Sequence, residues 1–166
     1  MIPRYRVLQQ RIAAEIDDLE RTQQAAQRHW QRAQSAGADQ DAYVNSVALN
    51  LHSFYSGLER ILELIAVELD GGTLGGADWH TELLQQMTLD LKKIRPSVLA
   101  RATAAHLDEY RKFRHRVRNI YAMSLDPVRM QPLVEELPAL WTDVRRDLSA
   151  FAQFLDALAE DDQPPP

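Results

Sequence analysis

The chain contains no cysteine, which excludes disulfide bonds, thiol nucleophiles and zinc sites with cysteine ligands. Long apolar runs are also missing, since no segment approaches the ~18 residues that a membrane-spanning helix needs. The N-terminal residues, MIPRYRVLQQRIAAEID, carry charges where a signal peptide needs its apolar core. These absences predict a protein of the reducing cytoplasm that has no contact with a membrane.

Glycine and strand-like patterns are scarce as well. Four of the six glycines lie in Gly71–Gly76, and proline is absent between Val7 and Arg95. Between these breaks the apolar residues recur every three or four positions, which indicates helices and leaves no candidate strand. The glycine stretch follows a predicted helix and lacks a Gly-Lys-Ser/Thr ending, so it does not indicate a phosphate-binding loop.

The periodicity predicts an all-α fold, an antiparallel bundle of about five helices. We expect the first helix to run from about Tyr5 to the mid-thirties and the second to carry the apolar stripe from Val44 to Leu69. A third, shorter helix ends before Pro96, and the last begins near Pro127. The predicted caps of the second, third and fourth helices are Asp39, Asp78 and Ser97.

At 166 residues the chain has the length of one ordinary domain. We expect a single helical domain over residues 1–160. The ending DDQPPP cannot pack against a core, so residues 161–166 are predicted to form a flexible tail.

Charge is distributed unevenly along a chain whose formal net charge is −5. Residues 90–118 hold nine Lys and Arg against three acids, whereas residues 135–162 hold eight acids against two bases. The net charge argues against non-specific coating of nucleic acid. A basic segment in an acidic protein nevertheless suggests that one surface meets an anion.

The densest polar segment is RKFRHRVRNIY, residues 111–121. At ~100° per residue of helix, Arg114, Arg118 and Tyr121 fall on one face, while Phe113 and Val117 face the core. Arginine forks match phosphate oxygens, so this face is a candidate phosphate-binding surface. The alternative is a solvated face whose arginines pair with the acids of the last helix: Glu135, Glu136, Asp143 and Asp147.

Three segments together resemble the HepT-like branch of the HEPN superfamily: NLHSFYSGLERILELIAVELDG, WHTELLQQM and FRHRVRNIY. The similarity covers about residues 40–158. It implies a small helical protein, typically a homodimer, that is the toxin of a toxin–antitoxin pair and cuts RNA without a metal or cofactor. The implied partner is a minimal nucleotidyltransferase antitoxin that neutralises it.

The family signature is Arg, four residues, His, one residue, Tyr, and it falls here on Arg114, Asn119 and Tyr121. The asparagine departs from the family pattern, because an amide has no proton to exchange near neutral pH. His115 is the nearest imidazole on the same helix and the candidate substitute. The resemblance implies that Arg114 and Asn119 lie in the catalytic site and that Tyr121 is the residue to which the partner transfers AMP.

The same resemblance implies that the other arginines of the helix, Arg111, Arg116 and Arg118, contact RNA phosphates. The reaction implied is attack of the 2′-oxygen on phosphorus, in a cleft that two copies of the helix form across a dimer. Two alternatives stay open. One is a HEPN protein that binds RNA, nucleotide or its partner without cutting, and the other is a purely structural dimer.

The remaining polar residues have plainer interpretations. Glu59, Arg60 and Asp70 are expected to form local ion pairs or caps. His52 and His106 are expected to pack in or beside the core. Trp79 and His80 are expected to anchor the third helix, with a dimer or RNA contact as the alternative.

Overall fold

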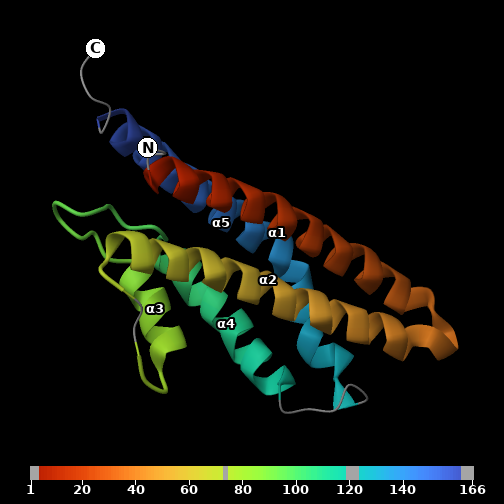
Figure 1. Cartoon of the computed structure of the whole chain (residues 1–166). Coiled ribbons are helices and arrows are strands. Elements are labelled where there is room, and N and C mark those ends of the chain that lie inside the picture. The colour runs from red at the N-terminus through yellow and green to blue at the C-terminus, as the bar shows by residue number, and fades with distance from the viewer. Residues whose placement is uncertain (1–3, 73–74, 119–123, 162–166) are drawn as a thin grey trace.

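The computed structural model describes residues 4–72, 75–118 and 124–161, and within them the chain is helical (Figure 1). The predicted all-α class is confirmed, and over the described residues the β-pairing is a single isolated bridge, Leu91 to Arg95. The elements in chain order are α1 (Arg4–Ser35), a 3₁₀ turn η1 (Gly37–Asp39), α2 (Gln40–Leu69), α3 (Trp79–Met87), α4 (Arg101–Val117) and α5 (Pro127–Asp161).

Helices α1 and α2 form an antiparallel hairpin, and α5 runs along α1 (Figure 1). The chain reverses at Gly37, whose φ of 56° lies in the left-handed region that glycine adopts without strain. Gly57, in the middle of α2, allows the hairpin to close tightly, because a Cβ there would lie 3.2 Å from Leu19 Cδ2. The predicted stripe of α2 is buried along most of its length.

Helix α5 contains Pro132 and Pro138 in its interior. A proline at position 138 has no N–H to donate to the carbonyl of Val134, four residues earlier. Gln27 of α1 donates its side-chain N–H to that carbonyl at 2.8 Å. A contact between helices therefore replaces the hydrogen bond that the proline removes, and α5 continues without interruption.

Two of the sequence-based expectations about helix ends are wrong. The apolar spacing extends the third helix to Leu91, but α3 ends at Met87, and Leu91 lies in a tight turn closed by the bridge to Arg95. Helix α4 begins at Arg101 and Ser97 does not cap it; instead Asp147 of α5 accepts a hydrogen bond from the N–H of Ala100 at 3.0 Å.

The predicted N-cap positions of Asp39 and Asp78 are confirmed, but the expected side-chain hydrogen bonds are not formed. Both residues occupy the N-cap positions of α2 and α3, but neither side chain makes a capping hydrogen bond. The predicted tail falls largely outside the described residues, which end at Asp161. Among the described residues no helix combines the length and the apolar character needed to cross a membrane.

Candidate functional site

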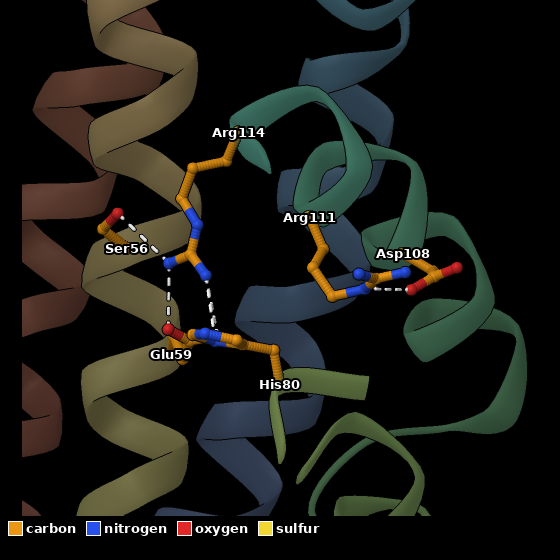
Figure 2. Close-up of polar contacts among 6 residues, drawn as sticks. All are labelled: Ser56, Glu59, His80, Asp108, Arg111 and Arg114. Carbon is orange, nitrogen blue, oxygen red and sulfur yellow. Dashed lines mark hydrogen bonds and ion pairs between the residues drawn. The ribbon is translucent and has the colours of Figure 1, made fainter. Parts of the chain in front are cut away.

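A polar cluster lies where α2, α3 and the basic segment of α4 meet. Its members are Glu59 from α2, His80 from α3 and Arg114 from α4 (Figure 2). The two guanidinium ends of Arg114 donate to the two carboxylate oxygens of Glu59, at 2.9 and 3.2 Å. His80 Nδ1 lies 2.7 Å from Glu59 Oε2 and 3.0 Å from Arg114 Nη2. We call these three residues the Arg114 cluster.

Arg114 has two further neighbours on α2. Its Nη1 lies 3.4 Å from the hydroxyl of Ser56, and its guanidinium carbon lies 4.6 Å from the centre of the Tyr55 ring. A guanidinium over an aromatic face is attracted by the negative face of the ring. Burial, followed by the charge of Glu59, raises the pKa of Tyr55, which keeps the phenol neutral. Arg114 is thus held on all sides by α2 and α3.

This geometry corrects the expected orientation of Arg114. The helical spacing predicts that Arg114 lies on the exposed face, opposite Phe113 and Val117, whereas the residue is only 5% exposed. Helix α4 packs against both α2 and α3, so its buried sector is wider than the apolar stripe alone indicates. The burial of a charge at this depth requires a partner of opposite charge, and Glu59 supplies it.

The first part of the basic segment is neutralised within its own helix. Arg111 donates to Asp108 at 2.6 Å (Figure 2). Lys112 pairs with both Asp108 and Glu109, at 3.5 and 3.2 Å. Burial tends to raise the pKa of Asp108, but the hydrogen bonds and charges of Arg111 and Lys112 bring it below its ordinary value. The hydrogen bond that Arg111 donates to Asp108 in turn raises the pKa of Arg111.

The last turn of α4 differs from this first part. Arg116 and Arg118 are exposed and form no ion pair with any residue of the described chain, and His115 is exposed beside them. The positive charges of Arg116 and Arg118 are available to a ligand. We call Arg116 and Arg118 the basic end of α4.

A hollow of about 280 Å³ lies next to the basic end, between α2 and the end of α4. Arg118 and His52 line it, together with apolar residues that include Leu49 and Val117. Burial, then the charges of Arg114 and Arg118, lowers the pKa of His52. The imidazole is therefore neutral near pH 7. His52 is half-buried and lines this hollow, which agrees with its expected place in or beside the core.

The acids of the last helix are not the partners of the α4 arginines. Glu136 contacts His106 at 3.1 Å and Asp147 caps α4, while Asp143 pairs with Arg146 of the same helix. His106 is therefore a partly exposed surface residue, and its expected place in the core is wrong. The hypothesis that helix α5 neutralises the basic face fails for these described residues.

Glu59 and His80 are the site residues that sequence reasoning undervalued. Glu59 was expected to pair locally, but Arg60 pairs with Glu15 of α1 instead. One signal was available, because Glu59 follows the buried Tyr55 by four positions and precedes the buried Leu62 by three. An acid at a core-facing position indicates a buried partner. His80 offers no such signal, since its neighbours come from distant segments.

Two of the predicted site residues, Asn119 and Tyr121, lie outside the described residues. Within the described chain no group of three or more His, Asp or Glu side chains is arranged to hold a metal ion. Of the predicted residues that are described, Arg114 lies in the Arg114 cluster, Arg111 turns toward Asp108 of its own helix, and His115, Arg116 and Arg118 are exposed on α4.

The helical bundle and its Arg-rich α4 define the class of this protein. A family model described as HepT-like protein matches residues 46–155, about two thirds of the chain, and so the chain belongs to the HepT-like family of the HEPN superfamily. The match spans α2 to α5 and includes the Arg114 cluster and the basic end. Searches of curated proteins and of solved structures found no match.

Proposed function

We propose that the protein is the toxin of a HEPN/minimal-nucleotidyltransferase toxin–antitoxin module and cleaves RNA without a metal ion. The observation that carries this proposal is the basic end of α4. Arg116 and Arg118 are exposed and unpaired within the described chain, whereas the other charges of the segment are neutralised. Two guanidinium groups at one end of the family's motif helix suit the phosphates of a single strand.

The neighbouring hollow supports the same ligand. It places apolar surface from Leu49 and Val117 beside Arg118 and the neutral imidazole of His52. A nucleobase needs an apolar face to stack on, and its phosphate needs a cation nearby. The hollow and the basic end together offer both to one nucleotide.

Arg114 has a different role in this proposal from the one the resemblance implies. Because its guanidinium is already bound by Glu59, it positions its neighbours and adds positive potential rather than gripping a phosphate directly. Direct phosphate contacts then fall to Arg116 and Arg118, with Arg111 at the edge of the cluster. Stabilisation of charge on the phosphoryl oxygens is the electrostatic contribution expected of such donors.

A second candidate function is favoured by a specific observation. The motif position for the catalytic histidine holds Asn119, and the described motif arginine is buried in an ion pair. A HEPN protein with these two features would bind RNA, nucleotide or its nucleotidyltransferase without cutting. Where the ligand is RNA, the two candidates use the same surface and differ only in the chemical step.

The remaining parts of the proposal follow the family. We propose a homodimer in the cytoplasm, a single domain over residues 1–160, a minimal nucleotidyltransferase as the antitoxin and Tyr121 as the acceptor of AMP. An added phosphate there would place negative charge near the basic end and repel RNA. Co-expression with a nucleotidyltransferase and mass spectrometry of Tyr121 test this part separately.

The test of cleavage uses the purified chain with total tRNA and a long mRNA in the presence of EDTA. We expect fragments that end in a 2′,3′-cyclic phosphate, and we expect RNA to bind with an affinity that falls as salt rises. Binding without fragments supports the second candidate. Absence of both binding and fragments overturns the RNA assignment altogether.

The basic end has a matched control elsewhere in the molecule. Replacing Arg116 and Arg118 together by Ala is expected to weaken RNA binding and to reduce the slope of log K against log salt by about 1.4, from two single-strand phosphate contacts. Arg6 and Arg11 of α1 are exposed and likewise form no ion pair with described residues. Arg6→Ala with Arg11→Ala removes the same charge and should leave the slope unchanged; equal losses from both pairs would show a non-specific charge effect.

A further inference from the structure

The Arg114 cluster contains an imidazole that the family signature does not include. His80 contacts both the motif arginine and a carboxylate. His52 lines the hollow, His106 pairs with Glu136, and His29 contacts Ser46. His80 therefore links the buried ion pair of Arg114 and Glu59 to an imidazole ring.

The hydrogen bonds of the cluster determine which ring nitrogen holds the proton. An ionised carboxylate only accepts and a guanidinium only donates, and both lie next to His80 Nδ1. The shorter contact is the 2.7 Å one to Glu59 Oε2, so Nδ1 carries the hydrogen and donates it to Glu59. The neutral ring then keeps its lone pair on Nε2, which makes no hydrogen bond to any described residue.

Exposure separates His80 from its two partners. The side chains of Glu59 and Arg114 are 6% and 7% exposed, whereas that of His80 is 25% exposed. Trp79 stacks on the imidazole with 3.7 Å between ring centres, which fixes the plane of the ring. The cluster thus holds a rigid imidazole between a buried orienting carboxylate and solvent, the arrangement in which an imidazole acts as a general base.

We propose that His80 is the residue that transfers protons in RNA cleavage, oriented by Glu59 and taking the place of the histidine that Asn119 replaces in the family signature. This inference rests on the proposed ribonuclease function. His80 Nε2 accepts the proton of the ribose 2′-hydroxyl while the 2′-oxygen bonds to phosphorus. The bond from phosphorus to the 5′-oxygen breaks, and the departing oxygen takes a proton from water. The hydroxide formed takes the proton from His80, leaving a 2′,3′-cyclic phosphate, a 5′-hydroxyl and the neutral ring.

The charges of the cluster suit this cycle. Glu59 and Arg114 cancel each other while His80 is neutral, and the carboxylate remains hydrogen-bonded to Nδ1 when the ring becomes an imidazolium.

The test compares His80→Gln with His106→Gln, a substitution of the same type on α4 at a histidine that pairs with Glu136 on the surface. Glutamine at position 80 keeps an N–H donor for Glu59 but removes the titratable nitrogen. We expect His80→Gln to lower kcat about 10²–10³-fold, the contribution typical of general acid–base catalysis, with little change in RNA affinity or Tm. His106→Gln should cleave like the parent chain.

Chemical rescue separates catalysis from a structural role. We expect His80→Ala to regain part of its activity with added free imidazole, and the acid limb of its pH–rate profile to follow the added base. Cleavage by His80→Gln within about threefold of the parent, a change smaller than general acid–base catalysis supplies, overturns the inference and leaves the proposed function intact. A parent chain that binds RNA and never cuts it overturns the inference and the ribonuclease together.

Discussion

Two arginines are buried in the described part of the chain, and their hydrogen bonds are satisfied in different ways. Arg95, in the turn between α3 and α4, donates to both oxygens of Asp70 at 2.6 Å and to the backbone carbonyls of Leu89, Pro96 and Gln86. These five hydrogen bonds use all five N–H groups of the guanidinium. Its side chain is 0% exposed and that of Asp70 is 2% exposed.

Arg114 also pairs with a buried carboxylate, but its other neighbours include a partly exposed side chain and further cations. One of its neighbours is a histidine whose side chain is 25% exposed, and the basic end of α4 begins two residues further along the helix. The Arg95 pair therefore holds a turn in place, whereas the Arg114 cluster joins a buried ion pair to an ionisable surface group. Burial of an arginine alone does not distinguish the two roles.

The largest effect is expected from Arg95→Ala. The change leaves the carboxylate of Asp70 buried without its cation, and breaking a buried pair in this way costs about 3–5 kcal/mol. Urea denaturation measures the loss as a lower midpoint with an unchanged slope. A loss below about 1 kcal/mol, the range of a surface ion pair, would show that the turn relaxes and hydrates Asp70.

Glu59→Gln and Asp70→Asn form a matched pair of isosteric substitutions, one in each buried ion pair. Each exchanges a charged hydrogen-bond acceptor for a neutral one, so each should destabilise the fold by about 1.5–3 kcal/mol. Glu59→Gln should also lower RNA cleavage on the order of tenfold to a hundredfold and shift the acid limb of the pH–rate profile, because His80 loses its orienting carboxylate.

Activity per folded molecule gives the decisive measurement for this pair. Asp70→Asn should leave it unchanged once the folded fraction is determined by circular dichroism. Equal loss of cleavage in both variants would mean that the two ion pairs have the same structural role, and the contrast between them would disappear.

The smallest effect is expected on the pKa of His52, which lines the hollow next to the basic end of α4. Burial first, then the charges of Arg114 and Arg118, lowers its pKa below the ordinary value of 6.5. Arg118→Ala removes one of these like charges, so the pKa should rise, and an NMR titration of the imidazole signals measures the change. A pKa that stays the same would place Arg118 too far from the hollow to influence it.

The same shift has a consequence for stability. Because the folded protein binds the His52 proton more weakly than the unfolded chain does, this group makes stability increase with pH from the lowered pKa up to about 6.5. Arg118→Ala should flatten that increase, and urea midpoints between pH 5 and pH 7 would record it.

Sequence alone determined the helical class and most of the core. The spacing of apolar residues is a local property, so the stripe of α2 and the start of α5 near Pro127 could be identified before any tertiary contact was known. The same held for the family, since its short motifs and their order are read along one chain. The basic segment and its departure at Asn119 were visible in the same way.

Only the tertiary structure decided which charges are used and which remain free. Helix α4 packs on α2, α3 and α5, and its contacts with α2 and α3 bury Arg114 against Glu59 and His80, 55 and 34 positions away in the chain. Likewise, the cap of α4 comes from Asp147 on α5, and the carbonyl released by Pro138 is satisfied from α1. Each of these contacts depends on the relative placement of whole helices, and a periodic pattern within one helix carries no information about that placement.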